Sequence, residues 1–119
     1  MDKNKIIKIQ KNIDNLKKTN SKTIFISGIF NTLHIGHFRL FKYAKQQADI
    51  LILGITSDSI SEGATIDDFN RLDAIRNIKD VDVSFIIDDD VNEVIKFIKP
   101  NFVLKGFEHK NKFNTEIEV

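Results

Sequence analysis

The chain has 119 residues and a mass of 13.7 kDa, with 41% hydrophobic and 29% charged residues, which fits one compact domain with its own core. Its 18 basic and 17 acidic residues give a formal net charge of +1, so no overall field attracts nucleic acid or an anionic membrane. The absence of cysteine excludes a disulfide framework, a thiolate metal site and a cysteine nucleophile. Residues 1–5 lack the apolar run of a signal peptide, and no stretch has the length of a membrane span. We therefore expect a cytoplasmic protein with neither nucleic-acid nor membrane partners.

Charge is unevenly distributed along the chain. Residues 1–22 carry seven Lys against two Asp, whereas residues 57–93 carry eleven acidic residues against three basic ones. The acidic stretch argues against a nucleic-acid groove on its face. The Lys-rich start is typical of a solvated helix face.

Helical and extended patterns alternate along the sequence. Ile6, Ile9, Ile13 and Leu16 recur every three or four residues, which predicts an amphipathic helix at the N-terminus. Four short runs predict strands, and the first two of them are apolar without strict alternation, which is typical of strands buried on both faces. These strands are expected over residues 23–27, 50–55, 81–87 and 102–104, with helices between them at about 36–49, 69–78 and 91–99.

This alternation implies crossover connections. We predict an α/β fold, a Rossmann-like doubly wound parallel sheet with helices on both faces. In such sheets a ligand binds at the carboxyl ends of the strands, where the winding order reverses. The predicted organisation is an N-terminal amphipathic helix over residues 1–21, followed by a second unit over residues 22–119.

Residues 28–37, GIFNTLHIGH, connect the first predicted strand to the following helix. His34 and His37 are three residues apart across Gly36, so both imidazoles can point to one side of the first helical turn. Backbone N–H groups and the positive end of the helix dipole attract phosphate at the same place. Gly28 and Gly36 keep side chains away from a ligand there. An imidazole that donates to a phosphate oxygen would stabilise the charge that grows during transfer at phosphorus.

The spacing of the two histidines leaves other interpretations open. Two His residues at this spacing also occur as metal ligands, or as surface residues that start a helix. No third His and no Cys lies nearby to complete a zinc site, which argues against a metal centre.

The whole segment, in its context of strand, loop and helix, resembles the HxGH nucleotidyltransferases, in particular their cytidylyltransferase-like branch. The resemblance also rests on residues 49–58, DILILGITSD, and extends from about Lys22 to the end of the chain. That branch includes glycerol-3-phosphate cytidylyltransferase and the adenylyltransferase domain of the heptose-phosphate bifunctional enzymes.

The resemblance implies that residues 22–119 form a nucleotidyltransferase domain. Such a domain transfers CMP or AMP from CTP or ATP to a phosphorylated sugar or polyol and releases pyrophosphate. It implies that His34 and His37 are the catalytic residues, which bind the triphosphate and stabilise the transition state. Magnesium is expected to accompany the triphosphate, with no protein metal ligand identified in the sequence. The implied nucleotide-binding residues are Gly28, Ile29, Phe30, Asn31, Gly36, Lys105, Gly106 and Glu108.

A second segment, residues 99–108, is typical of a helix end, a strand and a sharp turn. Lys105 could meet phosphate charge, and Glu108 could accept from a base amino group or a sugar hydroxyl. The Lys105–Gly106 pair is similar to the lysine–glycine pair of the heptose branch. Arg71 matches a family arginine that approaches the substrate phosphate or triphosphate, although an ordinary arginine on a helix surface would look the same in sequence.

The sequence also departs from the family pattern. Asn31 stands where the family usually has Asp, and residues 59–70 contain no Lys or Arg. Residues 88–90 are all Asp, where the glycerol enzymes place a substrate-binding lysine. The sequence ends before a further strand and a Ser/Thr-rich helix start that hold the triphosphate in the family, so we expect it to be part of a longer chain.

Two alternatives stay open. One, favoured by these departures, is a non-catalytic nucleotide-binding or assembly module with the same fold. The other takes the N-terminal amphipathic helix as a docking surface for a second subunit, because relatives in the family are often dimers and the sequence leaves a homodimer open.

Overall fold

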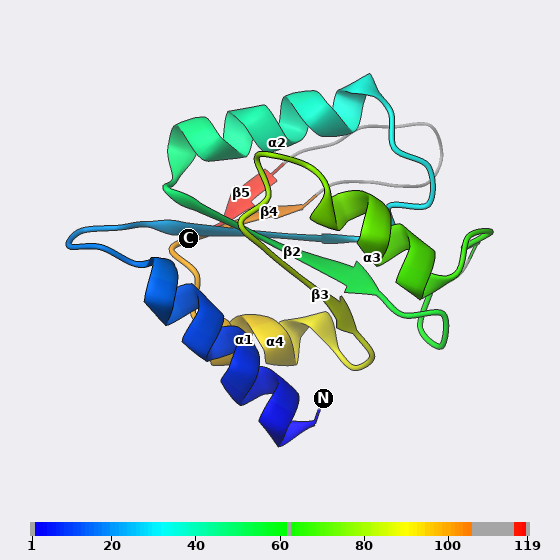
Figure 1. Cartoon of the computed structure of the whole chain (residues 1–119), viewed down its shortest axis with the longest axis horizontal. Coiled ribbons are helices and arrows are strands. Elements are labelled where there is room, and N and C mark those ends of the chain that lie inside the picture. The colour runs from blue at the N-terminus through cyan, green and yellow to red at the C-terminus, as the bar shows by residue number, and fades with distance from the viewer. Residues whose placement is uncertain (1, 62, 106–115, 119) are drawn as a thin grey trace.

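The chain folds into one sheet with helices packed on both of its faces (Figure 1). The computed structural model describes residues 2–61, 63–105 and 116–118, with side chains up to residue 104. Its elements in chain order are α1 (Lys3–Leu16), β1 (Thr23–Gly28), α2 (Ile35–Gln47), β2 (Ile50–Thr56), α3 (Asp68–Arg76), β3 (Val83–Ile87), α4 (Val91–Ile98), β4 (Phe102–Lys105) and β5 (Glu116–Glu118).

The strands lie in the order β3-β2-β1-β4-β5. β1 pairs in parallel with both β2 and β4, and β2 pairs in parallel with β3. The chain therefore moves outward from β1 to β3, then returns through α4 to the other side of β1. This topology confirms the predicted parallel α/β fold and places the reversal of winding order between β1 and β4. β5 adds an antiparallel strand beside β4, which the sequence did not indicate.

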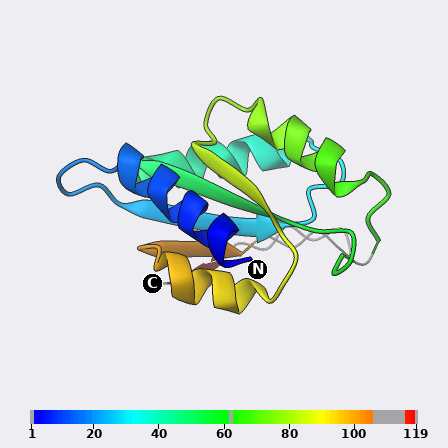
Figure 2. The same cartoon turned by 60° about the horizontal axis from the view of Figure 1, so that its bottom comes forward.

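Helices cover both faces of the sheet, as predicted. Successive residues of β1 point to opposite faces, so Ile24 and Ile26 join one core cluster and Phe25 joins the other. α2 and α3 pack on the first cluster, whereas α1 and α4 pack on the second. Figure 2 shows α1 and α4 on one side of the sheet and α2 and α3 on the other.

The predicted N-terminal helix is confirmed as α1. The side chain of Asp2 caps it by accepting from the backbone N–H of Asn4, and Ile9 and Ile13 are buried against the sheet. The Nζ of Lys5 donates to the carbonyl of Ile86 in β3 at 2.6 Å. Within the described part of the chain, no helix is both long and apolar enough to span a membrane.

The predicted helix over residues 69–78 differs from α3 in its buried face. Asp67 caps the helix by accepting from the N–H of Asn70, so α3 begins at Asp68 and ends at Arg76. Phe69, which the apolar spacing places in the core, is 76% exposed, whereas Arg71 is 1% exposed. The helix is rotated about its axis so that Arg71 rather than Phe69 points inward, because the Arg71 guanidinium has hydrogen-bond acceptors there.

Candidate active site

Both histidines lie at the first turn of α2. His34 is the N-cap residue, and its Nδ1 accepts from the backbone N–H of Gly36 at 3.0 Å. The Nδ1 of His37 accepts from the backbone N–H of His34 at 3.2 Å, so the two imidazoles cap the helix reciprocally. Their ring centroids are 4.1 Å apart. The prediction that both rings lie on one side of the first turn is confirmed.

These hydrogen bonds determine where the imidazole protons lie. Since both Nδ1 atoms accept from backbone N–H groups, each neutral ring carries its proton on Nε2. Each Nε2–H is then a donor at the end of α2 where the helix dipole is positive. A pair of donors in this position suits an anionic group such as phosphate.

The two rings differ in their surroundings. His37 is 2% exposed and packs against Phe30 and Phe41, with ring centroids 5.7 Å and 6.4 Å away. Phe30 is itself buried and has a φ of +52°, a left-handed conformation in which the chain turns away from β1. His34 is exposed. The turn at Phe30 thus places an aromatic support beside His37, while His34 faces solvent.

Gly28, Ile29, Phe30 and Lys105, which are also predicted to bind the nucleotide, lie at the same edge of the sheet. Gly28 ends β1, and Ile29 and Phe30 follow it directly. Lys105 ends β4, where its register partner is Ser27 of β1. These are the two strands between which the winding order reverses, where ligands bind in such sheets. Gly106 and Glu108 lie outside the described residues, as does the side chain of Lys105.

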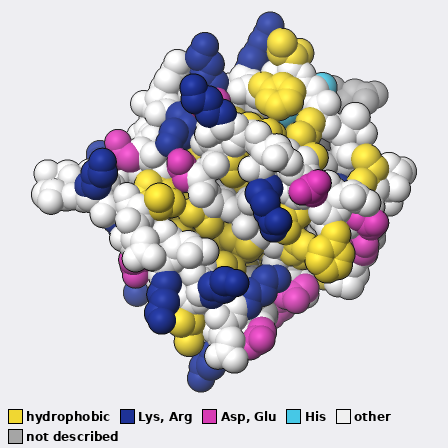
Figure 3. Space-filling view, viewed as in Figure 1, with side chains coloured by type: hydrophobic (Ala, Val, Ile, Leu, Met, Phe, Trp, Pro, Cys, Tyr) yellow, Lys and Arg dark blue, Asp and Glu magenta, His cyan; other side chains and the backbone are white. Residues whose placement is uncertain are grey.

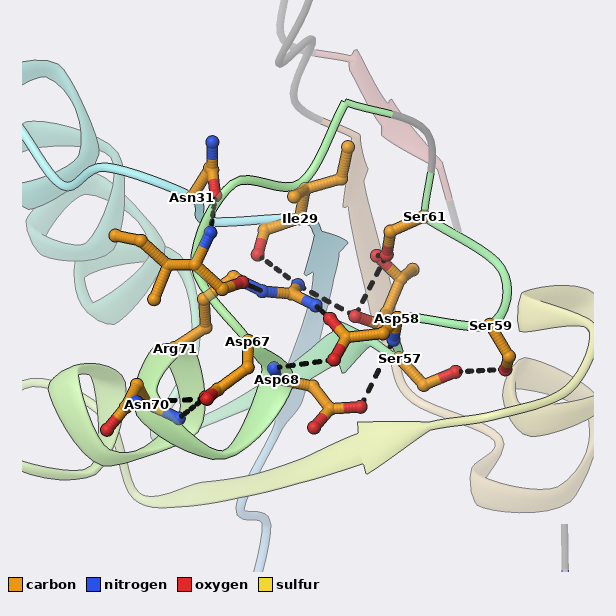
Figure 4. Close-up of polar contacts among 12 residues, drawn as sticks. Ile29, Asn31, Ser57, Asp58, Ser59, Ser61, Asp67, Asp68, Asn70 and Arg71 are labelled. Atoms are coloured by element: carbon orange, nitrogen blue, oxygen red, sulfur yellow. Dashed lines mark hydrogen bonds and ion pairs between the residues drawn. The ribbon is translucent and has the colours of Figure 1, made fainter.

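Arg71 does not fit the predicted contact with a substrate phosphate. Its Nε donates to the carbonyl of Ile66 at 2.8 Å, and its Nη1 donates to the carbonyls of Ile29 at 2.8 Å and Thr56 at 2.7 Å. Its Nη2 pairs with Oδ1 of Asp58 at 2.8 Å. The guanidinium is therefore buried among protein oxygens, and its role in this arrangement is to join the ends of β1 and β2 (Figure 4).

Asn31 binds protein groups through both ends of its amide. Its Oδ1 accepts from the backbone N–H groups of Thr65 at 2.8 Å and Ile66 at 3.0 Å. Its Nδ2 donates to Oγ1 of Thr65 at 2.7 Å and to the carbonyl of Gly63 at 3.4 Å. Nothing in the sequence marks Thr65 as its partner, because the two residues are 34 positions apart.

The described residues contain no cluster of side chains that could hold a metal ion without the substrate. None of them belongs to a group of three or more His, Cys, Asp or Glu that could hold a metal ion. Asn31 has no carboxylate, and the carboxylate of Asp58 is bound to Arg71. Mg²⁺ is often held chiefly by substrate phosphates, so the expectation of magnesium rests on the triphosphate alone. The roles proposed for the residues of this chain do not depend on the metal.

A separate groove of about 1110 Å³ lies between α1 and α3, along the outer edge of β3. Lys5 and Lys8 line one side, Asp68 and Phe69 the other, and Phe85 lies between them. Figure 3 views this face, where apolar side chains are visible among charged ones. His34, His37, Asn31 and the residues between Gly28 and Phe30 do not line the groove, so we do not assign the nucleotide to it.

The comparison with protein families agrees with this geometry. The model of the family described as Cytidylyltransferase-like matches residues 25–119, which include the β1–α2 loop and both histidines. The chain belongs to the Cytidylyltransferase-like family. The resemblance stated from the sequence is thereby confirmed, and the match begins after α1.

Curated relatives of this Cytidylyltransferase-like chain include longer proteins. The bifunctional protein HldE of Nitratiruptor sp. is 33% identical over 104 residues, which cover 82% of this chain and 22% of the relative. HldE of Campylobacter jejuni subsp. jejuni is 34% identical over 104 residues, which cover 82% of this chain and 23% of the relative. The chain therefore spans less than a quarter of the length of these relatives.

A solved structure shares the fold. It is the lipopolysaccharide core biosynthesis protein from Thermoplasma volcanium, with a TM-score of 0.69 and 24% sequence identity. The alignment covers 78% of this chain and 80% of that one. This likeness confirms the Rossmann-like α/β architecture.

Proposed function

We propose that this chain is a nucleotidyltransferase domain that transfers CMP or AMP from CTP or ATP to the phosphate of a phosphorylated sugar or polyol, and releases pyrophosphate. The observation that carries the proposal is the pair of imidazoles at the first turn of α2, with both Nδ1 atoms occupied by backbone N–H groups. Membership of the Cytidylyltransferase-like family and the similarity to HldE proteins support it.

The proposed reaction needs no protein nucleophile. An oxygen of the acceptor phosphate attacks the α-phosphorus in line, and a new P–O bond forms. The bond from the α-phosphorus to the oxygen that bridges to the β-phosphate breaks, and its electron pair leaves with pyrophosphate. Catalysis then depends on positioning the two phosphates and on stabilising the charge that grows on their oxygens.

The residues of the site have distinct roles in this proposal. The Nε2–H groups of His34 and His37, at the positive end of α2, stabilise the negative charge of the transition state. The backbone of residues 28–30 and Gly36 lets the nucleotide approach closely. At the end of β4, Lys105 and Gly106 meet phosphate, and Glu108 contacts the base or the sugar.

The His34→Asn and His37→Asn variants test these roles. The Oδ1 of asparagine is bonded to Cγ, as Nδ1 of histidine is, so it can accept from the same capping N–H at either position, but asparagine provides no donor at the position of Nε2. We expect each variant to stay folded and to release pyrophosphate about 10²–10³-fold more slowly, the effect of removing one donor to a transition-state oxyanion. Lys42→Ala, which removes an exposed side chain on the same helix, serves as the control and should leave the rate unchanged. Near-normal rates in both histidine variants would refute the assignment.

A nucleotide-binding module without turnover is the second candidate. It is favoured by Asn31, whose amide is engaged with residues 63–66 where the family usually has a carboxylate. Calorimetry with CTP and with ATP measures binding to this chain, and pyrophosphate release measures its turnover. Binding without turnover supports the module, whereas turnover supports the enzyme.

A further inference from the structure

Residues 63–66 form a largely exposed loop, and the side chain of Asn31 makes most of the hydrogen bonds that join it to the segment after β1. The amide of Asn31 makes hydrogen bonds to Gly63, Thr65 and Ile66, between 2.7 and 3.4 Å long. Ile66 is 40% exposed, so burial of apolar surface supplies only part of what holds this loop in place.

The loop is tied to the same edge of the sheet that carries the histidines. Asn31 follows Phe30 directly, in the segment between β1 and α2. Arg71 donates to the carbonyl of Ile66 and, through Nη1, to the carbonyl of Ile29. The loop is thus joined to the backbone just after β1 from two sides, as Figure 4 shows.

Gly63 provides a point at which the loop can turn. Its φ is +81°, which favours glycine, and a Cβ built on it would meet no atom of the described residues within 4 Å. Open space and a permissive backbone at one end allow the loop to swing if its ties are lost. The contacts with Asn31 therefore determine how much of the time the loop lies against β1.

We propose that Asn31 is a positioning residue, which holds residues 63–66 as one wall of the nucleotide site. The inference rests on the proposed function for the identity of the nucleotide. An amide suits this role because its oxygen accepts two N–H groups while its nitrogen donates to a hydroxyl and a carbonyl. A carboxylate could accept the same N–H groups but could not donate to the carbonyl of Gly63.

Two variants on opposite sides of the contact test the proposal. Asn31→Ala removes all the bonds from the amide, and Thr65→Val removes only the hydroxyl that accepts from Nδ2. We expect amide exchange at Thr65 and Ile66 to accelerate about tenfold in Asn31→Ala, and several-fold in Thr65→Val, because lost hydrogen bonds favour the open loop. The KM for the triphosphate should rise by similar factors with kcat nearly unchanged. Hydrogen exchange followed by NMR and initial-rate kinetics give the two readouts.

Two further variants separate positioning from other roles. Thr65→Ser keeps the hydroxyl and should behave like the unmodified chain, whereas Asn92→Ala makes the same substitution as Asn31→Ala at an exposed residue of α4 and should alter neither readout. If Asn31→Ala raises KM but Thr65→Val does not, Asn31 contacts the nucleotide directly and the proposal is overturned. Unchanged amide exchange in Asn31→Ala overturns it as well.

The test also distinguishes failure of this proposal from failure of the proposed function. If the unmodified chain releases no pyrophosphate, the enzymatic function fails. The affinities of the variants for CTP and ATP, measured by calorimetry, then replace KM. Weaker binding together with faster amide exchange still supports the positioning role, and unchanged affinity overturns it.

Discussion

Arg71 and Asp58 form an ion pair in which one partner is buried and the other faces solvent. Nη2 and Oδ1 are 2.8 Å apart, and the two side chains are 0% and 51% exposed. The remaining contacts of the guanidinium are with main-chain carbonyls, including those of Ile29 after β1 and Thr56 at the end of β2. One buried cation therefore holds together two strand ends beside the candidate active site.

Replacing Arg71 should destabilise the fold. Arg71→Met leaves the carbonyls of Ile29 and Thr56 without their donors, and we expect the free energy of unfolding to fall by about 3–5 kcal/mol, because each buried acceptor left unsatisfied costs about 1–3 kcal/mol. Arg71→Lys keeps the charge but loses the planar array of donors, so its cost should be smaller. Urea unfolding measures both.

Arg76→Met is the matched control for this comparison. Arg76 is exposed on the same helix, and its replacement should change the free energy of unfolding by less than about 0.5 kcal/mol. Equal losses in the Arg71→Met and Arg76→Met variants would contradict the role given to Arg71.

Features set by neighbouring residues were predictable from the sequence. The run TIFIS predicts a buried strand because it is apolar and short, and β1 covers it. The spacing of His34 and His37 predicts adjacent rings because both lie within one helical turn. Such patterns depend only on local geometry, which the order of residues determines.

Features set by distant partners were not predictable. Arginine is usually a surface residue, and the carbonyl of Ile29, which accepts from Arg71, is 42 positions away in the sequence. The exposure of Phe69 and the burial of Arg71 follow from those acceptors rather than from apolar spacing. β5 is short, and its pairing with β4 depends on the path of the intervening chain. Tertiary contacts decide all these cases.

Gly54 allows β2 to pack closely against its neighbours. A Cβ at this position would lie 2.3 Å from Cδ1 of Ile87 and 3.1 Å from Cζ of Phe25. Gly54→Ala should therefore lower the free energy of unfolding by about 1–3 kcal/mol, the usual cost of overpacking a core. Combining it with Ile87→Val, which removes Cδ1, should cost less than the sum of the single changes. Additive losses in denaturant titrations would show that the clash is not the cause.

Lys99 ends α4 in a left-handed conformation, with φ +52° and ψ +58°. A side chain is disfavoured there, so Lys99→Gly should raise the free energy of unfolding by about 0.5–1 kcal/mol, after allowing for the greater freedom of glycine in the unfolded chain. Lys96→Gly, within the same helix, should instead lower it by about 1 kcal/mol. Thermal unfolding measured by circular dichroism should show Lys99→Gly to be more stable and Lys96→Gly to be less stable than the unmodified chain. A loss of stability in both variants would contradict the argument.

Asn101 connects the beginnings of β1 and β4, the two strands between which the winding order reverses. Its Oδ1 accepts from the backbone N–H of Thr23 at 2.8 Å and from the Thr23 hydroxyl at 3.3 Å, and that hydroxyl accepts from the N–H of Asn101 at 3.2 Å. Thr23 is 2% exposed, so Asn101→Ala leaves a buried N–H without its acceptor and should cost about 1–3 kcal/mol of unfolding free energy.

The Asn101→Asp variant distinguishes the lost acceptor from other effects of the change. A carboxylate keeps an oxygen for both Thr23 donors, so this variant should retain most of the stability that Asn101→Ala loses. Urea unfolding of the two variants measures the difference, and equal losses would show that the acceptor is not what matters. Because this contact lies at the opposite ends of the strands from His34 and His37, pyrophosphate release by the folded variants should be unchanged.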